Sequence, residues 1–311
     1  MSTIKYANAV AAVKAMENTL LTRNDMEQFI SASSADEINS LISAKKGDTV
    51  SLENVWEMLR DYAPDSRELE ILLYKNDFHN LKAALKAMIS GREPQNYYIR
   101  PTNLDLNHLA QILSEKNYSS LPDFISETAE QAYELIVSTS NGQLVDTFID
   151  TSALMAMQRS SADFGSEFMQ KYAGLMTVCA DIKTAYRLSR MKKNKSFIES
   201  AVCGSSEIDK ETLVRETLGG TENLLNFLDS TPYSDVVPLL RNSPAQFEKW
   251  CDDIIMELAE TAGMKSFGTE PLIAYYIATE AEVKNLRIIT VCREFGADRE
   301  TITERMRKLY V

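Results

Sequence analysis

Glycine and proline are scarce in this chain of 311 residues, which contains only 11 glycines and 8 prolines. Proteins built from many strands and tight turns use both residues often, so an all-β architecture is disfavoured. Hydrophobic residues make up 44% of the chain and charged residues 25%, which is the balance of a folded protein. Alanine, leucine, glutamate, lysine and methionine recur, and these residues lose little side-chain freedom in a helix. We therefore expect an all-α fold.

Residues that commonly bind metals or act in catalysis are also few. The four cysteines are widely scattered and form no CxxC pair, so the clustered ligands of a zinc site are missing. The only two histidines, His79 and His108, are isolated in the sequence, and no G-x-x-x-x-G-K-[ST] phosphate-binding loop occurs. We predict that the chain has no catalytic residues, no cofactor and no metal.

The chain has too little positive charge to bind polyanions, because its formal net charge is −12. Such a surface repels phosphate backbones and anionic headgroups, so we expect neither nucleic-acid binding nor direct lipid insertion. The most apolar stretch, Leu272 to Ala278, is far shorter than the roughly 20 residues that span a bilayer. If the protein works at a membrane, it must dock there through another protein.

Apolar residues recur at helical spacing almost throughout, and several helix boundaries can be read directly. Asn24 with Glu27 and Ser34 with Glu37 stand at the spacing of a capping box, in which each residue satisfies a free backbone N–H group. Proline in the first turn and glycine after the last mark other boundaries. The expected starts are Asn24, Ser34, Ser66, Ser243, Thr269 and Asp298, and the expected ends are Gly91, Gly263 and Gly296.

Two irregular stretches, 92–103 and 204–209, interrupt the helical pattern with proline, glycine and polar residues. They divide the chain into segments of similar length, which we predict to be three helical modules. The predicted modules are residues 1–92, 93–205 and 206–311.

A short polar motif recurs once in each predicted module. The first reads Asp77-x-x-Asn80-Leu81-Lys82 and the third Glu282-x-x-Asn285-Leu286-Arg287, whereas the second keeps only Asp181-x-x-Thr184. Positions i and i+3 share a helix face, so acid and amide can share one polar environment. We favour internal packing for these residues, with contact to a partner as the alternative. The candidates, with Glu280 of a possible Glu280–Lys284 pair, are Asp77, Asn80, Lys82, Asp181, Glu280, Glu282, Asn285 and Arg287.

The stretch from Glu270 to Arg287 is the most specific signal in the chain, since it follows E-P-x-I-x-Y-x-x-x-x-E-x-E-x-x-N-L-R. It resembles the closing helix of the C subunit of archaeal and bacterial V/A-type ATPases, which is similar to the d subunit of eukaryotic vacuolar ATPases. The opening run 6–22, the motif at 77–82 and the ending 296–311 also resemble this family, while residues 141–206 match it thinly.

The resemblance implies a funnel-like body of three similar helical modules around a pseudo-threefold axis. One end would sit on the ring of membrane proteolipid subunits and the other would receive the central shaft. The chain would be a non-catalytic rotor subunit at the cytoplasmic side of the membrane. It would pass torque between ATP turnover and the transport of H⁺ or Na⁺.

Two other interpretations of the residues stay open. A generic acidic α-helical adaptor or scaffold protein would explain helicity, weak repetition and acidity without any ATPase. Its repeats, however, would be about a hundred residues long, well beyond the 20–50 residues of common solenoids. An acidic helical enzyme with an unrecognised site is disfavoured by the small number of histidines and glycines.

Overall fold

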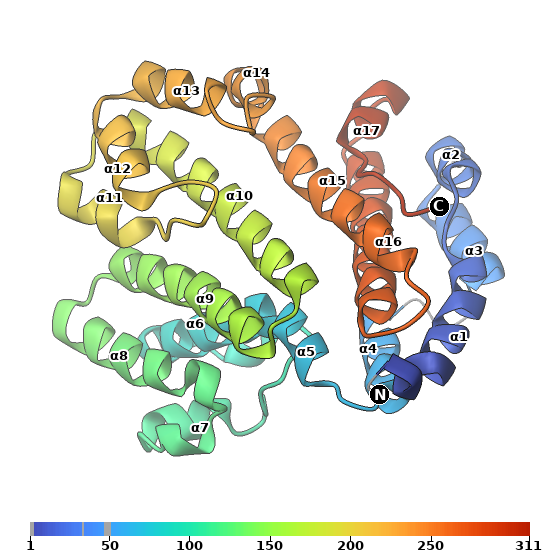
Figure 1. The fold of residues 1–311 in the computed structure, drawn as a ribbon, viewed down its shortest axis with the longest axis horizontal. Coiled ribbons are helices and arrows are strands. Elements are labelled where there is room, and N and C mark those ends of the chain that lie inside the picture. Colours follow the sequence, from blue (N-terminus) through green and yellow to red (C-terminus); the bar gives the residue numbers. More distant parts are fainter. Residues whose placement is uncertain (1–2, 33, 47–50) are drawn as a thin grey trace. The chain divides into compact units, whose positions relative to one another are not determined.

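The chain is all-helical, as the sequence predicts (Figure 1). The computed structural model describes residues 3–32, 34–46 and 51–311, and it contains no β-strand in these ranges. By their mutual contacts the residues form two compact units, Met1–Leu69 with Tyr233–Val311, and Glu70–Pro232. We call them unit 1 and unit 2. The division into three modules around a pseudo-threefold axis stays a prediction.

Unit 1 is built around the long helix α16, Glu270–Glu294, whose residues 271–279 are all buried. Helix α15 packs along it, and α1, α3, α4 and α17 contact it too. The apolar run 272–278 is therefore core, where each large side chain contributes about 1.5–3 kcal/mol. The other helices of unit 1 are α1 Ala7–Met16, α2 Arg23–Ser31, α3 Ala35–Lys46, α4 Leu52–Tyr62, α14 Val236–Asn242, α15 Pro244–Gly263 and α17 Arg299–Arg305.

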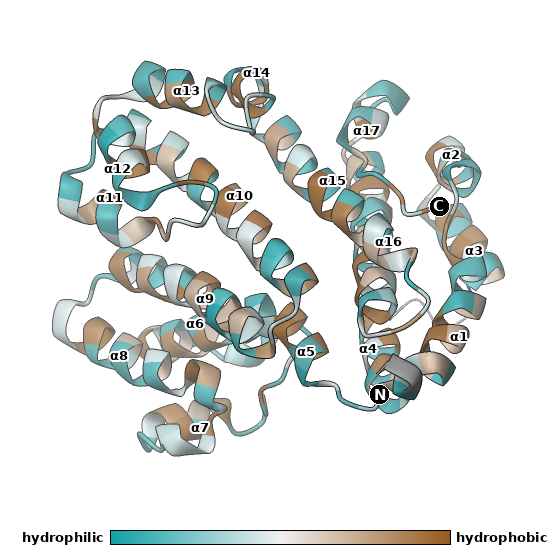
Figure 2. Cartoon of the chain, in the orientation of Figure 1, coloured by the Kyte–Doolittle hydropathy of each residue, from teal (hydrophilic) through white to brown (hydrophobic). Residues whose placement is uncertain are grey.

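Unit 2 is arranged around helix α9, Gly142–Phe164, which is contacted by α6, α8, α10 and α11. Tyr74 at the start of α6 stacks on Phe124 of α8, with ring centroids 3.9 Å apart and planes 8° from parallel. In Figure 2 the helices carry hydrophobic and hydrophilic residues on different sides, which is typical of helices half-buried in a core. The other helices are α6 Tyr74–Ser90, α7 Leu109–Ser114, α8 Asp123–Thr139, α10 Glu167–Met191, α11 Lys195–Ala201, α12 Lys210–Leu218 and α13 Thr221–Asp229.

Most of the helix boundaries expected from the sequence are present. Ser34, Ser243 and Asp298 each accept a hydrogen bond from a backbone N–H in the first turn of the helix that follows. Gly91, with φ of +66°, ends α6 in the left-handed conformation that glycine adopts without strain.

Two local expectations were wrong. The capping box of α2 is Thr22 with Asp25, not Asn24 with Glu27, because the helix begins at Arg23. The run expected to start after Ser66 as one helix is divided into α5, Arg67–Glu70, a 3₁₀ turn, Ile71–Leu73, and α6. The three residues of the turn, Ile71, Leu72 and Leu73, are all fully buried.

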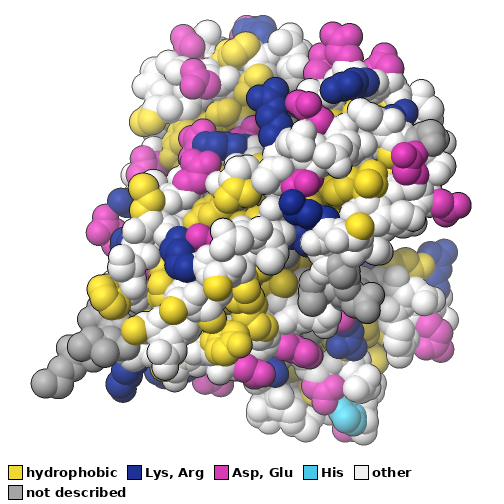
Figure 3. Space-filling view, turned by 90° about the vertical axis from the view of Figure 1, so that its right-hand side faces the viewer, with side chains coloured by type: hydrophobic (Ala, Val, Ile, Leu, Met, Phe, Trp, Pro, Cys, Tyr) yellow, Lys and Arg dark blue, Asp and Glu magenta, His cyan; other side chains and the backbone are white. Residues whose placement is uncertain are grey.

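The surface is mixed rather than uniformly polar. Figure 3 shows one face, on which acidic, basic and hydrophobic side chains are interspersed. Large apolar side chains reach solvent in unit 1, where Met264 is 79% exposed and Phe295 is 85% exposed. No helix in the described part of the chain is both long enough and apolar enough to cross a membrane.

Candidate functional site

The acid and the amide of the first motif hold a downstream segment onto α6. The Asp77 carboxylate accepts hydrogen bonds from the Asn103 backbone N–H at 2.7 Å and the Asn103 side-chain amide at 2.8 Å, and from the Thr102 hydroxyl. One turn later, Asn80 donates to the carbonyl of Ile99 at 2.9 Å and accepts from its N–H at 2.7 Å. Both motif side chains are fully buried. The proline-containing stretch 92–103 is therefore fastened to the helix rather than acting as a free linker.

The third motif repeats the amide contact and changes the acid contact. Asn285 donates to the carbonyl of Arg307 at 3.1 Å and accepts from its N–H at 2.8 Å, the same two-bond pairing that Asn80 makes. Glu282 instead accepts hydrogen bonds from two residues in the N-terminal part of the chain, from the backbone N–H of Leu21 and from the ammonium of Lys46. The Glu282 carboxylate and the Lys46 ammonium are both almost fully buried. This motif thus ties both the N-terminal helices and the end of the chain to α16.

The second motif also holds a downstream segment, but only its acid makes the contact. Asp181 accepts from the N–H groups of Cys203 and Gly204 at 2.9 and 2.7 Å, which fixes the loop after α11. Thr184 stands where the other motifs have asparagine, and it lacks the amide needed for two-point pairing. All three motifs therefore hold a segment that lies 19 to 26 residues further along the chain.

Burial raises the pKa of all three motif carboxyl groups. The pKa of Asp77 rises to about 6, with the hydrogen bonds from Thr102 and Asn103 opposing the effect of burial. Burial likewise raises the pKa of Asp181, against the N–H groups of Cys203 and Gly204, and the pKa of Glu282, against the charge of Lys46. A buried carboxyl with a raised pKa occurs both in active sites and in structural hydrogen-bond networks. The groups around the carboxyl therefore decide which role it has.

The remaining candidates lie nearer the surface. Lys82 pairs with Asp150 of α9, and Arg287 at the matching position of the third motif is exposed. Glu280 is partly buried, and Lys284, which we expected to pair with it, lies 2.7 Å from Asp252.

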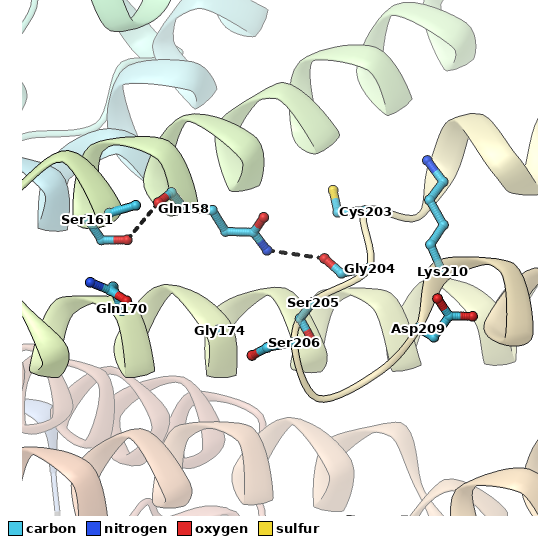
Figure 4. Close-up of a pocket in the computed structure, with 11 residues that line it drawn as sticks. Gln158, Ser161, Gln170, Gly174, Cys203, Gly204, Ser205, Ser206, Asp209 and Lys210 are labelled. Atoms are coloured by element: carbon cyan, nitrogen blue, oxygen red, sulfur yellow. Dashed lines mark hydrogen bonds between the residues drawn. The ribbon is translucent and has the colours of Figure 1, made fainter. Parts of the chain in front are cut away.

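A polar pocket of about 470 Å³ lies in unit 2, and its lining includes serine, cysteine, aspartate and lysine side chains (Figure 4). Its hydrogen bonds are used internally: Ser161 donates to the Gln158 carbonyl at 2.9 Å, and the Gln158 amide donates to the Gly204 carbonyl at 3.2 Å. Burial and the nearby Asp181 charge raise the pKa of Cys203 to about 12, so its thiol stays protonated at neutral pH. The Cys203 thiol is therefore not an activated nucleophile. The described residues also contain no group of three His, Cys, Asp or Glu side chains placed to hold a metal ion.

The sequence of the chain matches a known protein family. The family described as ATP synthase (C/AC39) subunit matches residues 49–305. The chain belongs to this family. The match includes all three polar motifs and the partners of the first two. The partners of the third motif, Leu21, Lys46 and Arg307, lie outside the matched residues.

Individual relatives in the C/AC39 family are distant but extend over nearly the whole length of the chain. It is 23% identical to the C subunit of the V-type sodium ATPase of Enterococcus hirae, over 99% of each chain. It is 21% identical to the C subunit of the A-type ATP synthase of Methanobrevibacter smithii, over 96% of this chain and 87% of the relative. It is 20% identical to the C subunit of the V-type ATP synthase of Thermus thermophilus, over 96% and 97%.

The paired contacts of Asn80 give the first testable prediction. Asn80→Ala leaves the N–H and the carbonyl of Ile99 without their partner, and we expect it to lower the free energy of unfolding of unit 2 by about 1–3 kcal/mol. Urea unfolding followed by circular dichroism measures this change. Ser90→Ala, on the exposed end of the same helix, is the control, and an equal loss in the two variants would contradict the role given to Asn80.

Proposed function

We propose that this chain is a non-catalytic rotor subunit of a V/A-type ATPase, which joins the central shaft to the ring of membrane proteolipid subunits. The observation that carries the proposal is the match to the C/AC39 family over residues 49–305, together with ATPase and ATP synthase C subunits that align along nearly their full length. The chain would sit on the cytoplasmic side of the membrane, held there by other subunits.

The internal construction of each unit favours a mechanical role. Long helices packed at interior density have low compressibility, so a torque applied at one element is passed on with little deformation. The buried contacts of Asp77, Asp181 and Asn285 fasten the irregular segments that follow α6, α10 and α16. These segments would otherwise be the most deformable parts of the chain, because loops make few buried contacts.

The surface favours docking on protein rather than on lipid. A net charge of −12 opposes approach to an anionic membrane, while exposed side chains such as Met264 and Phe295 offer apolar area to a protein partner. Rotor coupling needs such contacts with more than one neighbouring subunit.

Purification of the tagged full-length chain from gently solubilised native membranes tests the assignment to the complex. We expect proteolipid, shaft and catalytic ATPase subunits to co-purify in fixed proportion. Recovery of the chain alone, or with unrelated soluble proteins, would overturn the proposal.

Arg287 is the motif residue best placed to meet a partner, because its side chain is exposed on α16. We expect Arg287→Ala to leave the free energy of unfolding within about 0.5 kcal/mol of the original, as is usual for surface sites. Its association with membranes depleted of this protein should weaken about tenfold, because arginine is enriched among the few interface residues that carry most of the binding energy. Arg299→Ala, which changes an exposed arginine on α17, is the control. Equal membrane binding by the two variants would contradict a partner contact at Arg287.

A further inference from the structure

A groove of about 430 Å³ follows one face of α6 in unit 2. Its lining contains the basic side chains of Lys82, Lys86 and Arg92 and no acidic residue. The chain as a whole has a net charge of −12, so the charge of this lining is opposite in sign to that of the whole protein. A site of this charge attracts anionic groups that the rest of the surface repels.

The groove has the length and floor of a helix-binding site. Its α6 residues extend from His79 to Ser90, which is about 16 Å at 1.5 Å per residue. Ala83 and Ala87 form the floor, and such small side chains allow a second backbone to approach closely. Tyr97 supplies an apolar wall, and its side chain is 50% exposed. A single small anion would use only a fraction of this surface.

The wall that carries Tyr97 is already fixed in position. The carbonyl of Tyr97 lies 3.1 Å from the His79 ring nitrogen, and Asn80 pairs with the backbone of Ile99 two residues later. A preformed wall lowers the ordering cost that a partner meets on binding.

The lysines are likewise held at a defined spacing. Lys86 lies 2.7 Å from Asp146 of α9 and Lys82 pairs with Asp150, so two ammonium groups stand four residues apart along α6. Arg92 adds a third positive charge at the end of the groove. The two aspartates of α9 balance the charges of the two lysines, and the charge of Arg92 leaves the groove with a net positive charge. Carboxylates spaced four residues apart on a partner helix match this arrangement.

We propose that the α6 groove binds an acidic amphipathic helix from another subunit of the same ATPase. The partner's carboxylates face Lys82, Lys86 and Arg92, and an apolar side chain packs between Tyr97 and the alanine floor. The choice of partner rests on the proposed function, whereas the charge and shape of the groove do not. Because the ion pairs lie at the rim, they set the association rate and the salt dependence of binding more than the final affinity.

Photo-crosslinking from position 97 tests this proposal directly. Tyr97 is replaced by the aromatic photo-reactive residue p-benzoylphenylalanine in the full-length chain, which is then added to native membranes depleted of the protein. We expect irradiation to give one main protein adduct, whose cross-linked peptide contains acidic residues at i, i+4 spacing. Reversal of charge in Lys86→Glu/Arg92→Glu should lower the yield about tenfold, and raised salt should lower the yield of the original chain as well.

The control is Lys171→Glu/Lys195→Glu, which reverses two exposed lysines outside the groove and should leave the yield unchanged. Circular dichroism verifies that all variants fold. A chain that co-purifies with the ATPase but cross-links at position 97 only to lipid, to a non-acidic segment or to nothing would overturn the groove proposal alone. An acidic helical adduct from a protein outside any ATPase would support the groove and overturn the proposed function.

Discussion

Replacement of Glu282 by alanine is expected to lower the free energy of unfolding of unit 1 by about 3–5 kcal/mol, because it breaks a buried ion pair by removing one partner. The Lys46 ammonium is left buried without its carboxylate, and the Leu21 N–H loses its acceptor. Both tryptophans, Trp56 and Trp250, belong to unit 1, so urea unfolding followed by tryptophan fluorescence reports on this unit.

Two variants separate this cost from general damage to α16. Lys284 lies on α16, as Glu282 does, and pairs near the surface with Asp252 of α15. Lys284→Ala should cost no more than about 1 kcal/mol. Lys46→Met/Glu282→Met replaces both charges with apolar groups and should recover part of the loss, since no charge is then left unpaired. A Glu282→Ala variant no less stable than Lys284→Ala would show that the buried pair does not hold the N-terminal helices.

Asp77 is expected to make unit 2 less stable as the pH rises. Its pKa is about 6 in the folded chain and 3.8 in an unfolded reference. Below about pH 4 both states are protonated and the stabilising contribution is fully present. Between about pH 4 and pH 6 the unfolded state releases its proton first, so this contribution is lost as the pH rises through the folded pKa. At 1.36 kcal/mol per pKa unit the total change is about 3 kcal/mol.

Asp77→Asn removes the titration while keeping the size of the side chain. The difference in unfolding free energy between the original chain and the variant should fall across pH 4–6 and stay constant above it. Hydrogen exchange of the α6 and α9 amides measures this difference within unit 2. Asp105→Asn, at an exposed carboxyl whose pKa is lowered by His108, is the control and should not reproduce the slope. A difference that does not vary with pH would contradict the burial effect at Asp77.

Local sequence signals predicted the helices well, because capping and glycine stops act within a few residues. Ser243 and Asp298 cap helices as expected, and Gly91 ends α6. The error at Asn24 arose because Thr22 with Asp25 offers the same capping spacing two residues earlier. Sequence spacing alone does not choose between two overlapping boxes.

The polar motifs were found from the sequence, but their partners were not. Repetition marked Asp77 and Asn285, whereas Asn103 and Arg307 lie in irregular segments that offer no periodic signal. Lys46, the partner of Glu282, is more than 230 residues away in the chain, and only tertiary packing brings the two together. For the same reason the α6 groove could not be predicted, because Tyr97 and Arg92 enter it through the fastened segment after the helix.

Measurement of coupling in membranes depleted of this protein tests the proposed role most directly. ATP hydrolysis and ATP-driven ion uptake are measured together before and after the purified chain is added back. Rotor coupling predicts that depleted membranes hydrolyse ATP with little ion uptake, and that the chain restores uptake in proportion to the amount bound. Full uptake in depleted membranes, or binding that leaves uptake unrestored, would contradict it.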